Sequence, residues 1–334
     1  MKKILILLLA VMLVPLAACG TDNLAEYKKA AEKTEQIHKG QFSAEFSMTM
    51  DYNTDELTAE EVKELNYFKD MKGTFSSVYD DEAEKAILRN YMNFGGLGFD
   101  FDMYINGEEI FMKLPVVGKF MKIDEIQNAC NIDNIDDIET EEYSKEIVSD
   151  ETIRAFTDKW VNLMNDDDVF KGRDIILTTP DGEVKTTEYT ITLTGTQIRT
   201  MIEECADIAA KDEKLRQFCD NYMNIKFDEE EITFEEMLQY LKDNIEDYTV
   251  EDFKYTALVD IDGYIVNENI KFAVKAARGD LVLRGLNYNM DIITWDINKE
   301  QHFDFPELTD ENTIDADNAE ELPDLMKDMF EKRN

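Results

Sequence analysis

The chain of 334 residues has only two histidines and four cysteines, and its 35 basic residues are outnumbered by 74 acidic ones. A Ser–His–Asp or Cys–His site would have to use His38 or His302, and no nucleophile-elbow motif is present. Metal binding by cysteine and histidine has no support, because neither a CxxC nor a paired-histidine spacing occurs. We therefore expect no catalytic residue, no metal site and no cofactor, and we predict that the protein is not an enzyme.

Acidic residues offer little positive evidence for chemistry. Paired carboxylates can hydrolyse glycosides, but among 74 acids such pairs arise by chance everywhere. Asp260-Ile-Asp262-Gly263 places its glycine too early for an EF-hand loop, so we interpret it as a hairpin turn. Asp166–Asp168 is expected to be a solvated loop, and His38 to end the first helix, where a cation complements the helix dipole.

A strongly basic surface is also missing, which excludes partners that need one. Nucleic acid binding requires a basic face, and anionic headgroups attract basic segments. A net charge of −39 therefore argues against nucleic acid and against direct adsorption on a membrane. With 43% hydrophobic and 10% aromatic residues, the chain is nevertheless too rich in core-forming side chains to be disordered.

The N-terminus carries the most specific signal. Lys2-Lys3 precedes an apolar run from Ile4 to Leu13, and Leu16-Ala17-Ala18-Cys19 follows. A charged segment, an apolar segment and a small-residue site form a secretory signal peptide, and the apolar run is about half the ~20 residues needed to span a bilayer. The final four residues resemble the lipobox of bacterial lipoproteins. That resemblance implies cleavage before Cys19 and a diacylglyceryl lipid on its thiol; the alternative is an ordinary signal peptide with an incidental cysteine.

The signal peptide defines the predicted organisation of the chain. We expect a signal peptide at 1–18, a lipidated cysteine and short tether at 19–23, one domain at 24–308, and an acidic tail at 309–334 with a weak helix near 322–332. Loss of residues 1–18, which hold two lysines and no acid, moves the net charge from −39 to −41. Lipid on Cys19 would therefore provide the membrane attachment, and diacylation is sufficient for stable anchoring.

The hydrophobic pattern predicts an α+β fold. A helix is expected over 24–39, closed by Gly40, and a strand follows in which every second residue from Phe42 to Tyr52 is apolar. Capping boxes begin at Thr58 and Thr233, Asn106-Gly107 marks a hairpin, and 131–142 lacks periodicity and is expected to be a loop. One long helix is predicted over 196–222. Because Cys205 and Cys219 would then lie ~21 Å apart, they and Cys130 are interpreted as free thiols.

Phenylalanine and methionine alternate along several of these strands. They are candidates to line an apolar concavity, since methionine adapts to irregular apolar ligands. The alternative is that they form the core beneath the helices, which periodicity alone does not distinguish. The candidate lining residues are Phe42, Phe46, Met48, Met50, Phe99, Phe101, Met103 and Met112.

Three segments carry a resemblance to a known class of protein. The lipobox, the helix beginning Leu24-Ala-Glu-Tyr-Lys-Lys, and the strand and hairpin at 41–50 and 104–113 resemble a broad class of uncharacterised Gram-positive lipoproteins. Their architecture is similar to that of LolA and LppX, an incomplete antiparallel barrel with helices on its concave side. The resemblance implies that acyl chains bind between sheet and helices. It is strongest over 24–123 and identifies no individual binding residue.

We therefore expect a lipoprotein on the extracytoplasmic face of the cell membrane that binds or senses an apolar or lipid ligand. The alternative is a non-catalytic scaffold or interaction protein of the envelope that has no ligand cavity. The sequence does not identify a protein partner.

Replacing the lipobox cysteine tests the anchor. Cys19→Ala should abolish incorporation of labelled palmitate and shift the protein from the detergent phase to the aqueous phase, because the acidic domain has no other means of membrane attachment. Cys205→Ala is the matched control and should partition like the wild type. Continued membrane retention of Cys19→Ala would show that the anchor lies elsewhere.

Overall fold

A computed structural model describes residues 22–55, 57–107, 109–113, 118–122, 148–222, 226–227 and 230–314. The predicted signal peptide, Cys19, Cys130, the loop at 131–142 and the helix near 322–332 lie outside the described residues. No described helix is both long enough and apolar enough to cross a bilayer.

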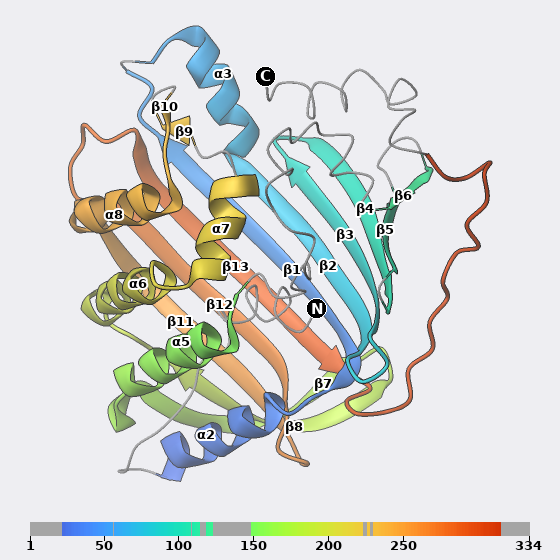
Figure 1. Ribbon diagram of the computed structural model, residues 1–334. Coiled ribbons are helices and arrows are strands. Elements are labelled where there is room, and N and C mark those ends of the chain that lie inside the picture. Colours follow the sequence, from blue (N-terminus) through green and yellow to red (C-terminus); the bar gives the residue numbers. More distant parts are fainter. Residues whose placement is uncertain are drawn as a thin grey trace.

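Eleven strands form one antiparallel sheet in the order β6-β5-β4-β3-β2-β1-β13-β12-β11-β8-β7 (Figure 1). The strands are β1 Lys39–Tyr52, β2 Asp70–Asp80, β3 Lys85–Phe94, β4 Leu97–Asn106, β5 Glu109–Lys113, β6 Phe120–Lys122, β7 Val169–Thr179, β8 Gly182–Ile191, β11 Tyr248–Asp260, β12 Ile265–Ala276 and β13 Leu283–Trp295. A separate ribbon pairs β9 Lys226–Phe227 with β10 Glu230–Glu231. Strand β1, the first in the chain, therefore lies in the middle of the sheet.

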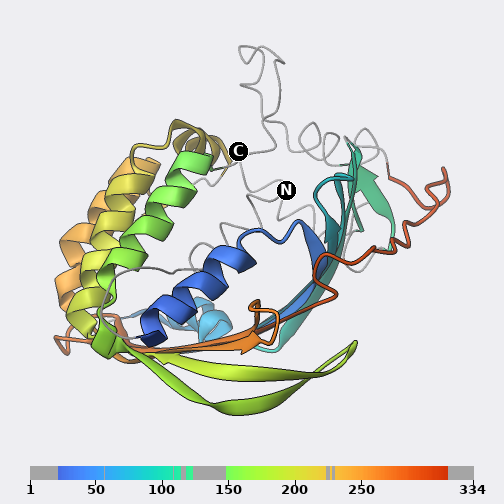
Figure 2. The same ribbon diagram turned by 90° about the horizontal axis from the view of Figure 1, so that it is seen from below.

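The sheet curves, and most of the helices lie on its inner face. Figure 2 shows the helices over one half of the sheet, while β2–β6 rise as the opposite wall. The helices are α2 Asp22–Thr34, α3 Ala59–Phe68, α5 Asp150–Leu163, α6 Gly195–Ala209, α7 Glu213–Tyr222 and α8 Phe234–Asn244, with short 3₁₀ turns η2 Asp166–Asp168 and η3 Ile245–Asp247. The prediction of an α+β fold with a large curved antiparallel sheet is confirmed.

Helix α2 is packed directly on this sheet. Its apolar stripe is almost fully buried, with Leu24 and Tyr27 at 1% and 0% exposure. The helix ends at Thr34, whose hydroxyl accepts a hydrogen bond from the Ile265 backbone N–H of β12 at 2.9 Å. The prediction of a helix to residue 39 was therefore wrong. Gly40 lies within β1, and His38 is four residues beyond the helix end.

The single helix predicted over 196–222 is two helices. Asp212 ends the continuity, because its carboxylate accepts hydrogen bonds from the backbone N–H groups of Lys214 and Leu215 at the start of α7, and from that of Ser149 before α5. An aspartate that caps a new helix stabilises a break that an apolar pattern alone does not reveal. Cys205 and Cys219 are free thiols as predicted, and burial raises the pKa of each to about 11.

The local signals for caps and turns were accurate. Both predicted capping boxes, at Thr58 and Thr233, have the reciprocal hydrogen bonds that define the motif. Gly107 and Gly263 adopt the positive φ angles that their hairpins require, at 64° and 87°. Asp166–Asp168 forms η2, and the Asp168 carboxylate accepts a hydrogen bond from the Gln197 side chain of α6 at 2.9 Å.

The outer face of the β3–β6 wall has its own small core. Ile87, Tyr104, Phe111 and Phe120 are buried there against Phe303, Phe305 and Leu308 of the segment that follows β13. The chain continues along β6, where the Phe120 N–H donates to Asn312 O and the Ile314 N–H donates to Phe120 O. Side chains on the inner face of the same wall therefore face away from this cluster.

Gly73 of β2 allows close packing on the inner face. A Cβ atom there would lie 2.5 Å from the Phe46 ring and 2.6 Å from Tyr91 O. We predict that Gly73→Ala lowers the free energy of unfolding by about 1–3 kcal/mol, because the ring and the neighbouring strand would have to shift. Gly279→Ala, which meets no atom within 4 Å, should have little effect. Urea unfolding of both variants measures the difference, and equal midpoints would contradict the packing argument.

Candidate functional site

The inner face of strands β1–β5 is the candidate site, and we call it the inner wall. Residues directly opposite in an antiparallel pair share a face, so the strand register defines the side chains of the inner wall row by row. The rows are Met48–Met71–Phe94–Leu97, Phe46–Gly73–Met92–Phe99, Ala44–Phe75–Asn90–Phe101, Phe42–Ser77–Leu88–Met103–Met112, and Gly40–Tyr79–Ala86–Ile105–Ile110.

The structure places all eight candidate lining residues on this one face. Seven of them fall in the rows above, and Met50 follows Met48 two positions along β1. The β1–β13 register continues the same surface onto Met290 and Tyr288, beneath the helices. Lining of a ligand cavity by these eight residues remains a prediction.

Aromatic rings of the inner wall contact one another in pairs. Phe46 and Phe75 stack with ring centroids 5.6 Å apart, and Phe42 meets Tyr79 edge to face at 6.5 Å. Farther along the wall, Phe94 lies 6.4 Å from Phe99 and 6.2 Å from Phe68 of α3. Phe42, Phe46 and Phe75 also pack against the main core under α2, so this end of the wall belongs in part to the core that the alternative interpretation expected.

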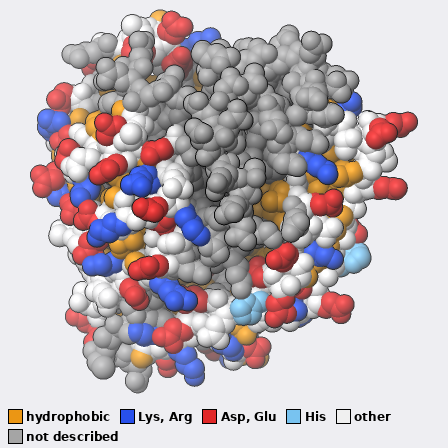
Figure 3. Space-filling view, viewed as in Figure 1, with side chains coloured by type: hydrophobic (Ala, Val, Ile, Leu, Met, Phe, Trp, Pro, Cys, Tyr) orange, Lys and Arg blue, Asp and Glu red, His pale blue; other side chains and the backbone are white. Residues whose placement is uncertain are grey.

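Many of these side chains retain solvent exposure. Phe42, Phe46, Phe99 and Phe101 are half-buried, Leu97 at the end of the wall is 51% exposed, and Phe68 of the adjacent α3 is 46% exposed. Figure 3 shows hydrophobic side chains on this face, over β2 and β3 beside the grey region, whereas charged side chains cover the helices. A contiguous exposed apolar surface in a soluble domain commonly marks a binding site.

The inner wall carries no charged side chain in any of its rows. Its two hydrogen-bonding side chains besides Tyr79 are Ser77 and Asn90, and the Asn90 amide donates to Phe101 O at 3.3 Å. A ligand on this wall would therefore meet apolar surface and almost no competing polar contact.

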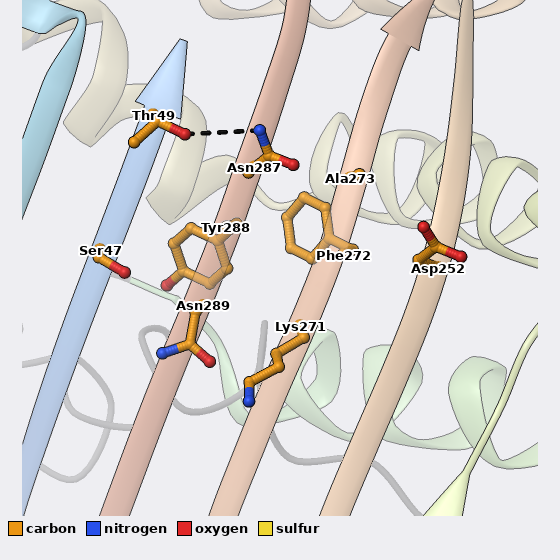
Figure 4. A pocket seen from close by; sticks show the side chains of 9 residues that line it. All are labelled: Ser47, Thr49, Asp252, Lys271, Phe272, Ala273, Asn287, Tyr288 and Asn289. Carbon is orange, nitrogen blue, oxygen red and sulfur yellow. Dashed lines mark hydrogen bonds between the residues drawn. The ribbon is translucent and has the colours of Figure 1, made fainter.

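A pocket of about 280 Å³ lies elsewhere, on the outer face of the sheet (Figure 4). Its side chains are mainly polar, including Ser47, Thr49, Lys271 and Asn289. None of the eight candidate lining residues borders it, because Phe42, Phe46, Met48 and Met50 point to the other face of β1 and the remaining four lie on β4 and β5. The pocket is open, combines polar side chains with Phe272, Ala273 and Tyr288, and includes none of the residues expected to line an apolar concavity.

A buried polar cluster beneath α2 was missed by the sequence analysis. The Tyr255 hydroxyl donates to Glu268 Oε2 at 2.7 Å, and the hydroxyls of Tyr27 and Tyr255 are hydrogen-bonded to each other. Glu268 is 4% exposed, and desolvation raises its pKa to about 7 despite the Tyr255 hydrogen bond. The alternation of β12 offered a signal, because Glu268 shares a face with Ile270 and Phe272.

A second contact fixes the exposed side of α2. Glu26 accepts hydrogen bonds from Lys171 of β7 and from the Tyr189 hydroxyl of β8, the latter at 2.7 Å. The Lys171 contact is the main cause that lowers the pKa of Glu26. The Glu26 contacts and the buried tyrosine–glutamate cluster together connect α2 to strands β7, β8, β11 and β12. These contacts serve to position the helix on the sheet.

The described residues contain no group of three or more His, Cys, Asp or Glu side chains placed to hold a metal ion. Asp260 accepts the Tyr264 N–H at 2.8 Å within its hairpin, as expected for a turn residue. His302 contacts Asp304 on the exposed surface at 3.1 Å.

Comparisons with known proteins leave the family open. No protein-family model matches the chain, and no curated protein matches it. Among solved structures, a lipovitellin described under lipid–protein interactions is similar over 81% of this chain and 26% of its own, with 10% identity and a TM-score of 0.24. The chain thus spans about a quarter of that protein, and a similarity of this size does not establish a shared fold.

The Glu268 carboxyl gives the fold a specific pH dependence. Its pKa is about 7 in the folded state, against an ordinary value of 4.5, so the folded chain holds a proton that the unfolded chain has lost between these values. The protonated Glu268 carboxyl therefore favours the folded state fully below pH about 4.5. This stabilisation is lost as the pH rises through about 7, where the carboxyl ionises in the folded protein. Glu268→Gln should remove this dependence and raise stability at pH 8 by about 3 kcal/mol relative to wild type.

Chemical denaturation from pH 4 to pH 8 measures this effect as the difference between variant and wild type. Glu45→Gln removes an exposed carboxylate from the outer face of β1 and serves as the matched control. A Glu268→Gln difference that stays constant across the pH range would refute the buried-acid interpretation.

Proposed function

We propose that this chain is an extracytoplasmic lipoprotein, held at the cell membrane by lipid on Cys19, that binds an apolar or lipid ligand on its inner wall. The observation that carries the proposal is the uncharged, half-buried surface of aromatic and methionine side chains across β1–β5. The proposal is for a non-catalytic protein, without a cofactor.

The composition of the inner wall supports an acyl chain better than a small polar ligand. Ligand sites are concave and mostly apolar, with few polar groups, and methionine side chains adapt to irregular apolar shapes. Met48, Met71, Met92, Met103 and Met112 are distributed over three of the five rows. A flexible hydrocarbon can follow such a surface along its length.

The position of the domain relative to the anchor supports the same proposal. The first described residue, Asp22, follows Cys19 by three residues, and three residues of extended chain reach only about 10 Å. A domain held that close to a bilayer is suited to take up or to sense a membrane lipid. The resemblance to LolA and LppX has the same implication and enters as part of this proposal.

Native mass spectrometry of the mature protein purified from its own cells tests the function. Lipid that copurifies with the folded protein, and that is lost on denaturation, is the expected result. A bare protein mass would instead favour the alternative, a scaffold or interaction protein of the envelope whose wall is covered by its own chain.

A pair of substitutions locates the ligand. Phe99→Lys places a charge on the inner wall and should reduce the copurified lipid severalfold, because a lysine would be desolvated against the acyl chain. Asp100→Lys is the matched control on the exposed outer face of the same strand and should retain the lipid. Thermal unfolding of both variants shows that the loss is not a loss of folding. Equal lipid content in folded Phe99→Lys would place the ligand elsewhere.

A further inference from the structure

One hydroxyl on the inner wall lacks a hydrogen-bond partner. Ser77 of β2 is 3% exposed, and its Oγ atom is fully enclosed and makes no hydrogen bond to any described residue. Leaving a buried hydroxyl unpaired costs about 1–3 kcal/mol, so buried hydroxyls nearly always have a partner. An unpaired buried hydroxyl of this kind indicates that a hydrogen-bond acceptor from a bound ligand completes the site.

The neighbours of Ser77 on the wall are apolar or aromatic. Phe75 and Tyr79 flank it along β2, Phe42 lies opposite on β1, and Leu88 lies opposite on β3. The hydroxyl thus lies within the aromatic part of the inner wall, where Tyr79 and Asn90 are the other side chains with polar groups and the Asn90 amide already donates to Phe101 O. Its partner would have to reach it across apolar surface, as a polar group inside an otherwise hydrocarbon ligand does.

The inner wall has no charged side chain, and this determines which polar group of a ligand can bind beside Ser77. A free fatty acid would place a carboxylate among side chains that include no lysine or arginine, and an unpaired buried carboxylate is far costlier than an unpaired carbonyl. A plain hydrocarbon would leave the hydroxyl unsatisfied. A neutral ester carbonyl avoids both costs, since it accepts one hydrogen bond and carries no charge.

We propose that Ser77 donates a hydrogen bond to the ester carbonyl of an acyl chain bound on the inner wall. This inference rests on the proposed function and narrows it, since the ligand class becomes esterified acyl lipids instead of free fatty acids or simple hydrocarbons. Ser77 selects by the polar group, whereas the surrounding rings and methionines bind the chain.

Competition with the uncharged fluorescent probe phenylnaphthylamine tests the selection on the mature protein. The competitors are a medium-chain methyl ester, the alkane of equal length and the corresponding free fatty acid. Wild type should bind the ester roughly fivefold to tenfold more tightly than the alkane, the gain from one additional hydrogen bond. The free acid, ionised at neutral pH, should bind more weakly than the ester.

Substitutions at the hydroxyl complete the test. Ser77→Ala should bind ester and alkane equally and should fold as well as wild type, because it removes an unpaired polar group. Ser77→Cys keeps the size but weakens the donor and should give an intermediate preference. Ser76→Ala, on the opposite face of the same strand, should keep the full preference of wild type.

The outcomes separate this inference from the proposed function. If all competitors displace the probe but Ser77→Ala retains the ester preference, the role of Ser77 is wrong and the binding function stands. If no competitor displaces the probe from wild type, the proposed function itself fails. Tighter binding of the free acid than of the ester would also overturn the inference.

Two natural sources contain the same ester, a glycerolipid and the diacylated cysteine of another lipoprotein. A soluble diacylglycerol and a diacylated cysteine peptide therefore serve as further competitors. If a competitor displaces the probe from wild type more strongly than from Ser77→Ala, its ester is bound by Ser77. The competitor that shows this difference identifies the natural source of the ester.

Discussion

The register of β1 is the constraint on which both halves of the molecule depend. This strand pairs with β2 on one side and with β13 on the other, and each pairing runs over most of its length. Because side chains alternate between faces, a slip of one residue would turn Phe42, Phe46 and Met48 to the outer face. The rows of the inner wall and the core under α2 would then be lost together. The tight fit of Phe46 over Gly73 opposes such a slip.

The sequence predicted what is encoded locally, and it failed where distant parts of the chain meet. Alternation along β1, the capping boxes at Thr58 and Thr233 and the glycine turns depend on neighbouring residues, and these predictions were accurate. At the break, Asp212 also accepts a hydrogen bond from Ser149, sixty-three residues away, and Thr34 at the end of α2 accepts one from Ile265. The placement of all eight candidate lining residues on one face follows from alternation, whereas the burial of Glu268 and the isolation of Ser77 follow from tertiary packing.

The two faces of the sheet have different chemistry, and this difference separates structure from proposed function. On the outer face, Asn267 and Asn269 donate to Asp291 and to backbone carbonyls of β13, which gives the sheet a ladder of polar contacts. On the inner side, the helices cover the half that contains Glu268 and the tyrosines, and no described helix lies along the inner face of β3–β5 (Figure 2). The main core therefore lies in the half that the helices cover, and Phe99, Phe101 and Met103 of the other half are only half-buried.

The central position of β1 also has a consequence for how the chain folds. Its partner β13 lies about 240 residues later in the chain, since Gln41 faces Trp295 and Met50 faces Leu286. A chain that emerges N-terminus first would expose one free edge of β1, with its phenylalanines and methionines, until almost the entire domain has been released. Sheets dominated by such distant pairings fold slowly and are prone to aggregate while incomplete. The order of the strands thus leaves the middle of the sheet incomplete until β13 has been made, before any ligand is involved.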